Sequence, residues 1–198
     1  MTFQIQKQKY MQALASGLKD KSKKGFLDEE IKGLVTAINN HADYYTTSSC
    51  SGRILLYVVT EERKKNETQW LFVSHNLVSL KDIEKTLDTI QNQKVFFRDQ
   101  TVFFRFEPLI LHIVCKTMDA ANALLQLCNN AGLKHSGIIS LQKRIIVEII
   151  GNDLLDAPIF FNRKMLLTTD GLAFFVSEAN KKMKKNVERI ERLRGLFS

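Results

Sequence analysis

The stretch Thr46-Thr-Ser-Ser-Cys-Ser-Gly-Arg53 organises this sequence, because it joins two segments that are typical of β-strands. Tyr44 and Tyr45 precede it, and the apolar segment 54–59 follows it. Small hydroxyl and thiol side chains, a glycine that can adopt positive φ and a fixed cation together suit an anion or a polar ligand held close to the backbone. An ordinary polar β-turn is the alternative interpretation.

Helical and extended patterns follow one another along the rest of the chain. Apolar residues spaced by three or four predict helices, and short apolar runs between turn residues predict strands. The expected helices cover residues 3–18, 28–40, 80–91, 118–131 and 170–194. The expected strands cover residues 44–49, 53–60, 70–75, 94–98, 102–106, 110–115, 134–141 and 144–150. A loop over residues 152–158 and extended chain as far as Thr168 precede the last helix.

Four residues predict helix ends. Asp28 can cap the second helix, and Ser79 with Asp82 can open the third. Thr117 can cap the fourth helix, and Gly132 suits the position just after its end.

This order of elements predicts an α+β fold. We expect a single domain over residues 1–198, with a mixed, mostly antiparallel sheet and flanking helices. The order α-β-β-β-α that starts at helix 28–40 recurs from helix 118–131 onwards, and this candidate internal repeat favours two equivalent layers that share one sheet. Neither GxGxxG nor GxxxxGK[ST] occurs, so the sequence does not indicate a Rossmann or P-loop nucleotide site.

Composition favours a globular intracellular protein with a polyanionic partner. Of the 198 residues, 44% are hydrophobic and 25% are charged, which is ordinary for a soluble domain. The net charge of +8 favours nucleic acid as a partner, and a solvated basic surface is the alternative. No apolar run approaches the roughly 18 residues of a membrane span, and the amino terminus lacks the apolar core of a signal peptide.

The three cysteines are Cys50, Cys115 and Cys128. They are odd in number and widely spaced, and no CxxC or Cys/His cluster occurs, so neither a disulfide framework nor a metal site is predicted. Cys50 could be a nucleophile, but no histidine is tied to it by spacing, and a small buried thiol is the alternative.

Two histidines are the candidates for proton transfer. His75 ends the expected strand 70–75, where it can act as a general base or as a hydrogen-bond donor. His112 lies within the apolar run 109–115, so it must either be hydrogen-bonded or face a cleft. A structural hydrogen bond is the alternative for both. Trp70, the only tryptophan, could stack a nucleic-acid base or fill the core.

Cations follow both hydroxyl-containing segments. Arg53 could hold a carboxylate or a phosphate with two hydrogen bonds, or could form a surface ion pair with Glu61 or Glu62. Ser136-Gly137, followed by Lys143-Arg144, has similar chemistry. We therefore expect one polar cleft lined by residues 48–53, His75 and residues 136–144.

Several motifs together resemble one family. They are Thr46-Thr-Ser-Ser-Cys-Ser-Gly-Arg-Ile54, Trp70-Leu-Phe-Val-Ser-His75, Phe106-Glu-Pro-Leu-Ile-Leu-His-Ile-Val-Cys115, Gly132-Leu-Lys-His-Ser-Gly-Ile138, Ala179-Asn-Lys-Lys-Met183 with Arg189-Ile-Glu-Arg192, and Lys23-Lys-Gly-Phe-Leu-Asp-Glu29. The sequence resembles the wybutosine-synthesising methyltransferase family, the enzymes of the N4-methylation step in assembling the tricyclic guanine of phenylalanine tRNA. It departs from the family pattern at Ile150, where members tend to carry an arginine, so any ligand contact expected from that arginine is in doubt.

The resemblance implies transfer of a methyl group from S-adenosylmethionine to a modified guanosine beside the anticodon of phenylalanine tRNA. It also implies a cytoplasmic enzyme without metal or membrane association, and a fold unlike that of Rossmann methyltransferases. Positioning of donor and acceptor on one axis should supply much of the rate.

Expected roles follow from the resemblance and from residue chemistry. The expected cofactor-binding residues are Ser48, Ser49, Cys50, Ser51, Gly52, Arg53, Ser136 and Gly137. His75 and His112 are expected to contact the acceptor base or to receive its proton. The expected tRNA contacts are Trp70, Arg144, Lys181, Lys185 and Arg189, of which the last three belong to the basic final helix.

Two other functions are alternatives. A tRNA-binding module without chemistry would use the basic final helix and Trp70, and S-adenosylmethionine would leave its thermal stability unchanged. A small-molecule hydrolase that uses Cys50 with His75 would lose its activity on thiol alkylation.

Overall fold

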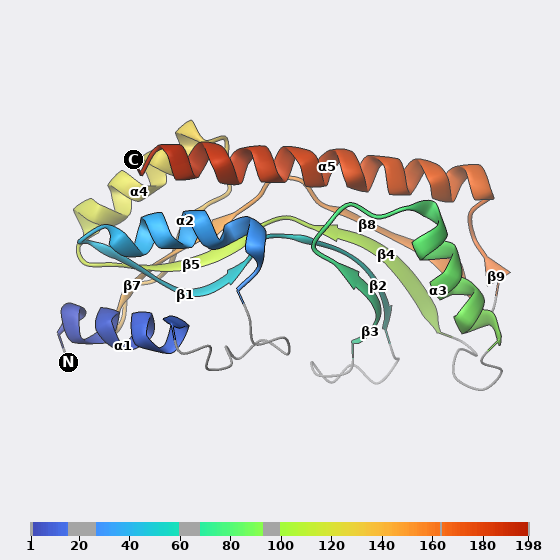
Figure 1. The fold of residues 1–198 in the computed structure, drawn as a ribbon, viewed down its shortest axis with the longest axis horizontal. Helices are drawn as coiled ribbons and strands as arrows, with labels where there is room; N and C mark the ends of the chain where they lie inside the picture. The colour runs from blue at the N-terminus through green and yellow to red at the C-terminus, as the bar shows by residue number, and fades with distance from the viewer. Residues whose placement is uncertain (1, 16–26, 60–67, 93–99, 163, 198) are drawn as a thin grey trace. The chain divides into compact units, whose positions relative to one another are not determined.

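The structure is a computed structural model that describes residues 2–15, 27–59, 68–92, 100–162 and 164–197. These residues form five helices and nine strands (Figure 1). The helices are α1 (Phe3–Ala15), α2 (Glu29–Asn40), α3 (Leu80–Asn92), α4 (Met118–Asn130) and α5 (Thr169–Gly195). The strands are β1 (Tyr44–Cys50), β2 (Arg53–Val59), β3 (Gln69–Ser74), β4 (Thr101–Glu107), β5 (Ile110–Cys115), β6 (Gly137–Ser140), β7 (Ile145–Ile150), β8 (Leu155–Phe161) and β9 (Lys164–Met165).

The chain folds into two compact units. The first unit comprises Met1–Ser51, Pro108–Asn152 and Asn186–Ser198, and the second comprises Gly52–Glu107 and Asp153–Lys185. Helix α5 therefore contributes its first part to the second unit and its last part to the first.

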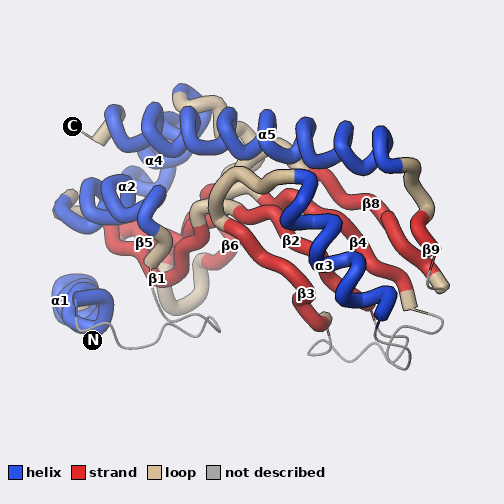
Figure 2. The backbone as a smooth tube through the Cα atoms, turned by 45° about the vertical axis from the view of Figure 1, so that its right-hand side comes forward, coloured by secondary structure: helices blue, strands red, loops and turns tan. Residues whose placement is uncertain are grey.

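The first unit is built on an antiparallel sheet with the strand order β1-β5-β7-β6, which we call the first sheet. Its inner face packs against α2, α4 and the end of α5, with a core that includes Leu34, Ile38, Leu111, Ile113, Leu124, Val147, Ile149, Ile190 and Leu193. Helix α1 lies on the other side of β1 from α2, as both ribbon views show (Figures 1 and 2). There the rings of Phe3 and Tyr10 lie against the buried Tyr45.

The second unit is built on an antiparallel sheet with the strand order β3-β2-β4-β8-β9, which we call the second sheet. Alternate residues of β4 face its core, as expected for a strand with one buried face, whereas the central strand β2 is buried on both faces from Ile54 to Val58. The core includes Ile54, Leu56, Val58, Ile83, Leu87, Val102, Phe104, Phe106, Leu172, Val176 and Met183, so α3 and the first part of α5 cover this face.

Most predicted helix ends are confirmed. The backbone N–H and the hydroxyl of Ser79 donate to Asp82 at 2.8 and 2.7 Å, and the hydroxyl accepts from the Asp82 N–H at 3.3 Å. The hydroxyl of Thr117 accepts from the Ala120 N–H at 3.1 Å. Gly132, with φ of +82°, adopts the left-handed conformation that ends many helices.

The predicted α+β class is confirmed, but the strands form two sheets rather than one shared sheet. The proposed internal repeat does not correspond to the two units, because β1 belongs to the first sheet while β2 and β3 belong to the second. Likewise, β6 and β7 belong to the first sheet and β8 to the second. Strand β8 also replaces most of the loop predicted at 152–158, and the strand predicted at 94–98 lies outside the described residues.

In the part of the chain that the structure describes, none of the helices combines the length and the apolar character that crossing a bilayer requires.

Candidate active site

Four residues form a row across the first sheet, and we call this set the central row. Ser48 on β1 is paired with His112 on β5, His112 with Glu148 on β7, and Glu148 with Gly137 on β6. Residues directly opposite in antiparallel strands project from the same face. The neighbours of His112 along β5 are buried in the core, so the central row lies on the outer face of the sheet.

His112 and Glu148 form a hydrogen-bonded pair at the middle of the central row. The Nε2 atom of His112 lies 2.8 Å from Oε2 of Glu148, and their side chains are 32% and 29% exposed. When Nε2 carries the proton, it donates to the carboxylate and leaves a lone pair on Nδ1. A histidine oriented by a carboxylate in this way can act as a general base.

A β-bulge presents Ser48 on the outer face. Pairing between β1 and β5 shifts between Thr46 and Ser48, and the hydroxyl of Thr47 donates to the His112 carbonyl at 3.3 Å. Thr46 is buried instead, where its backbone N–H donates to Asn39 of α2 at 2.8 Å. Without the bulge, Thr46 and Ser48 would project from the same face, so the extra residue redirects the serine.

The end of β1 is fixed by two buried contacts. Both the backbone N–H and the hydroxyl of Ser51 donate to the carboxylate of Asp28, at 2.8 and 3.1 Å. The Ser51 carbonyl accepts from Nδ2 of Asn186 in α5 at 2.6 Å. Asp28 stands at the N-cap position just before α2, but the predicted capping bond is absent, because its carboxylate accepts from Ser51 instead.

Beside the central row lies a less polar row on the same face. Cys50 is paired with Ile110, and Ile110 with Ile150. Ile150 therefore adds an apolar side chain close to the histidine–glutamate pair. This arrangement supplies both polar groups and apolar surface to a ligand on the outer face.

Ser136 and Gly137 lie at the far edge of the first sheet. The Ser136 hydroxyl accepts from the Ile150 N–H at 3.4 Å. A Cβ added at Gly137 would meet no atom within 4 Å, so there is open space beside this backbone. Strands β1 and β6 are three strand spacings apart, about 14 Å, so the two hydroxyl-containing segments share a face without touching.

Arg53 and Trp70 belong to the second unit and contact one another there. The Nε atom of Arg53 donates to Glu107 at 2.7 Å, and its guanidinium lies 4.3 Å from the centre of the Trp70 ring. Arg105, on the same face, bonds to Asp156 at 2.5 Å and to Glu107 at 3.2 Å. The predicted alternative partners of Arg53, Glu61 and Glu62, lie outside the described residues.

Gly52 and His75 meet in the second unit. Gly52 has φ of +101°, a backbone conformation that only glycine adopts readily. Its carbonyl lies 2.9 Å from Nδ1 of His75. His75 is therefore hydrogen-bonded at the end of β3, as either of its predicted roles allows.

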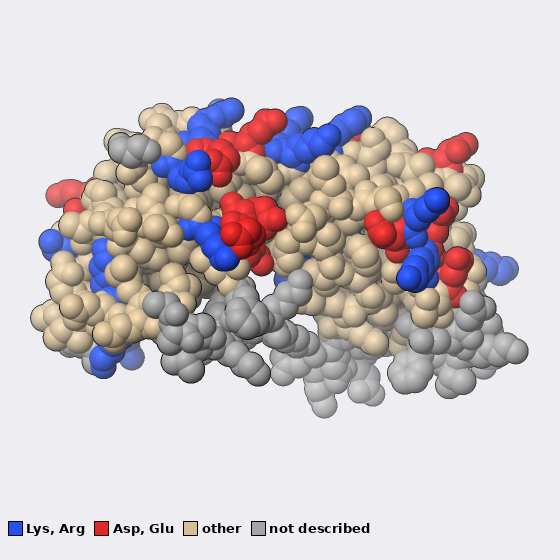
Figure 3. All heavy atoms as spheres, viewed as in Figure 1, with Lys and Arg blue, Asp and Glu red and all other residues tan. Residues whose placement is uncertain are grey.

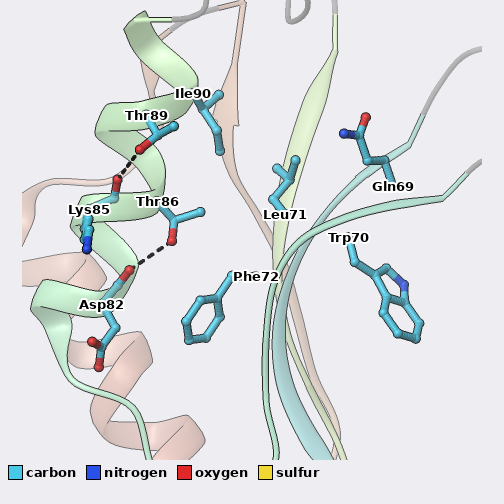
Figure 4. A pocket seen from close by; sticks show the side chains of 9 residues that line it. All are labelled: Gln69, Trp70, Leu71, Phe72, Asp82, Lys85, Thr86, Thr89 and Ile90. Atoms are coloured by element: carbon cyan, nitrogen blue, oxygen red, sulfur yellow. Dashed lines mark hydrogen bonds between the residues drawn. The ribbon is translucent and has the colours of Figure 1, made fainter. Parts of the chain in front are cut away.

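A cavity of about 530 Å³ lies between α3 and β3 in the second unit. In Figure 4, Asp82, Lys85 and Thr86 reach it from the helix, and Phe72 reaches it from the strand. The indole of Trp70 points away from the helix, and Trp70 is 38% exposed. The indole is thus outside the buried core that was one of its two predicted places, and it lies against the guanidinium of Arg53.

The predicted basic residues of α5 are surrounded by mixed charge. Figure 3 shows acidic side chains among the lysines and arginines along this helix. Lys181 pairs with Glu178 at 2.6 Å, and Lys182 lies 3.8 Å from Asp153. Among the residues that the structure describes, Lys184 and Lys185 form no ion pair, so they keep their charge available to a polyanion. Arg189 lies on the part of α5 that belongs to the first unit.

Cys115 and Cys128 should resist alkylation in the folded protein. Burial raises the pKa of each thiol to about 12, because the charged thiolate is poorly solvated there. At neutral pH, iodoacetamide is expected to modify Cys50 before either of them, and to modify all three in urea. Mass spectrometry of tryptic peptides checks this, and fast native modification of Cys115 or Cys128 would contradict their burial.

The sequence interpretation missed Glu148 and Asn186. Glu148 is a single charge within the apolar run 145–150, the same signal that identified His112. Asn186 is a fully buried polar residue on the apolar side of α5. The neighbouring Lys184 and Lys185 led to the interpretation of this part of the helix as a basic surface. An asparagine among the apolar positions of a helix is itself a sign of a buried hydrogen bond.

Residues 5–198 match the family described as Methyltransferase TYW3. The chain belongs to this family. The resemblance expected from the motifs is thereby confirmed, and the chain is a member of a methyltransferase family.

Relatives with similar sequences carry names from one biosynthetic process. The tRNA wybutosine-synthesizing protein 3 homologs of Danio rerio and Xenopus laevis are 35% and 36% identical over 177 residues, covering 87% of this chain and 67% of each relative. The tRNA wybutosine-synthesizing protein 2/3/4 of Arabidopsis thaliana is 34% identical over 202 residues, covering 96% of this chain and 20% of the relative. The chain thus spans about two thirds of the animal proteins and a fifth of the plant protein.

Two archaeal structures share the fold. The PH1069 protein from Pyrococcus horikoshii has a TM-score of 0.87 and 30% identity, covering 100% of this chain and 96% of that chain. A hypothetical protein from Aeropyrum pernix has a TM-score of 0.71 and 22% identity, covering 86% of this chain and 96% of that chain, which supports the fold alone.

Proposed function

We propose that this chain is the S-adenosylmethionine-dependent methyltransferase that methylates N4 of the tricyclic wyosine-type guanosine beside the anticodon of phenylalanine tRNA. Membership of the TYW3 family and the relatives named for wybutosine synthesis support the process. The observation that carries the chemistry is the partly exposed hydrogen bond between His112 and Glu148 on the outer face of the first sheet. We also propose that residues 1–198 act together, in the cytoplasm.

The residues of the outer face suit a methyl donor and a base. S-adenosylmethionine supplies a methyl group from its sulfonium when it is bound. Ser48 offers a hydroxyl, Gly137 leaves space beside its backbone, and the Cys50–Ile110–Ile150 row offers apolar surface. The remaining proposed cofactor contacts are Ser49, Ser51, Gly52, Arg53 and Ser136.

His112 is the proposed proton acceptor. With the donor bound to supply the methyl group, Nδ1 of His112 would receive the proton that N4 loses on methylation. The imidazolium that results is stabilised by the Glu148 carboxylate. His75 is a proposed second contact to the base, and Trp70, Arg144, Lys181, Lys185 and Arg189 are proposed contacts to tRNA.

The direct test is incubation with labelled S-adenosylmethionine and tRNA from cells that lack this methylation step. We expect one labelled nucleoside, with the mass of the N4-methylated tricyclic guanosine, and no label in tRNA that already carries the methyl group. Label in another nucleoside, or none, would refute the proposal.

Binding of the donor separates an enzyme from a tRNA-binding module without chemistry. A hundredfold excess of S-adenosylmethionine over its dissociation constant should stabilise an enzyme by about 2.7 kcal/mol. A module that does not bind the donor would show an unchanged thermal midpoint.

A further inference from the structure

We infer that a pocket at the end of the first sheet binds a phosphate of the tRNA strand. The pocket has a volume of about 270 Å³ and lies within the first unit, and we call it the basic pocket. Its lining comes from α1, the end of β5 and the turn between β6 and β7: Phe3, Gln6, Val114, Lys116, Lys143 and Arg144, among others. This inference rests on the proposed tRNA substrate and assigns one of its contacts.

The charges that line the basic pocket favour an anion. Lys116, Lys143 and Arg144 contribute three cations, and none of the described lining residues is acidic. Lys143 is exposed, and the half-exposed Lys116 lies 3.4 Å from Asp43. A phosphate that enters would be shared by flexible ammonium groups and a planar guanidinium, the two kinds of donor that bind phosphates in proteins.

Arg144 is held in place without being neutralised. Its Nη1 donates to the Tyr10 hydroxyl at 3.1 Å, and its guanidinium lies 5.8 Å from the centre of that ring. The hydroxyls of Tyr10 and Tyr45 both raise the pKa of this guanidinium. Two tyrosines thus fix the guanidinium in position, and among the described residues no carboxylate forms an ion pair with it.

Arg53 and Arg105 provide the contrast within the same chain. Glu107 lies 2.7 Å from Arg53 and 3.2 Å from Arg105, and Asp156 lies 2.5 Å from Arg105. Carboxylates therefore already balance the charge of these two arginines. Of these three arginines, Arg144 is the one without a carboxylate partner among the described residues, so its charge can interact with an external anion.

The basic pocket lies along the same strand face as the proposed proton acceptor. Val114, which lines the pocket, is two residues from His112 on β5, so both side chains project from the outer face. Lys116 is four residues from His112, about 13 Å along the strand. A nucleotide whose base lies at His112 would place a neighbouring backbone phosphate towards the pocket.

The test measures how salt weakens tRNA binding to a Lys116→Ala/Lys143→Ala double variant. Loss of the contact to this one phosphate of a single strand should lower the slope of log affinity against log salt by about 0.7 in the double variant. The affinity for S-adenosylmethionine, measured by calorimetry, should equal that of the wild type. The KM for tRNA should rise, because the two lysines are proposed to bind the substrate.

A matched double variant, Lys81→Ala/Lys164→Ala, removes two exposed lysines of the second unit and should keep the wild-type slope. An unchanged slope in the pocket variant, or equal losses in both variants, would overturn the inference. Weaker donor binding with an unchanged tRNA slope would also overturn it, because the anion would then be the donor's carboxylate. If the wild-type protein neither binds nor methylates tRNA, the proposed function itself fails.

Discussion

Replacing His112 with glutamine should lower kcat for methyl transfer by about 10²–10⁴-fold, the usual contribution of a positioned acid–base group. Glutamine can still hydrogen-bond Glu148, but it has no basic nitrogen to receive the proton of N4. The side chain is one third exposed, so the fold should tolerate the change. Single-turnover methylation at saturating tRNA and donor measures the effect on chemistry, and a thermal melt confirms folding.

His135→Gln is the matched control. His135 is exposed and lies outside the central row, so this variant should methylate at the wild-type rate. Glu148→Gln probes the positioning of His112 and should lower kcat less than His112→Gln does. A wild-type kcat for His112→Gln would show that His112 is not the proton acceptor.

Replacing Asn186 with alanine should lower the free energy of unfolding by about 2–6 kcal/mol. Asn186 is fully buried, its Nδ2 donates to the Ser51 carbonyl at 2.6 Å, and its Oδ1 accepts from the Leu109 N–H at 2.8 Å. Alanine would leave both backbone groups buried without this partner, at about 1–3 kcal/mol each. Urea unfolding would show the loss as a lower midpoint with a similar slope.

Asn122→Ala on α4 is the control for that prediction. Asn122 is exposed, so its replacement should change stability by no more than about 0.5 kcal/mol. A similarly small change in stability for Asn186→Ala would contradict the prediction, because the ends of β1 and β5 would then not depend on their hydrogen bonds to α5. A large loss of stability in Asn186→Ala would show that the asparagine holds the end of β1 at Ser51 and the start of β5 at Leu109.

Much of the local structure could be predicted from short-range patterns. The strand 110–115 coincides with β5, and the stripe of apolar residues in the last helix marks α5 within one residue at each end. The caps at Ser79 and Thr117 were also predicted, because both depend on residues three positions apart. His112 was identified as a candidate because a histidine within an apolar strand must find a polar partner.

Sequence reasoning could not assign the apolar stripe of α5 to two cores. Leu172, Val176 and Met183 pack in the second unit, whereas Ile190 and Leu193 pack in the first. A helical period reports which side of a helix is buried, but not what covers it. The predicted single sheet was wrong for the same reason, since strand patterns do not specify which strands pair.

By itself, the sequence determined the five helices, most of the strands, the family and the residue types available for chemistry, because these depend on neighbours along the chain. Tertiary structure alone decided that β5 lies between β1 and β7, which brings Ser48, His112 and Glu148 side by side. The histidine and the glutamate are 36 residues apart in sequence and 2.8 Å apart in space. Their pairing follows from long-range strand register, which is set by the burial of one face of the sheet and by the bulge in β1.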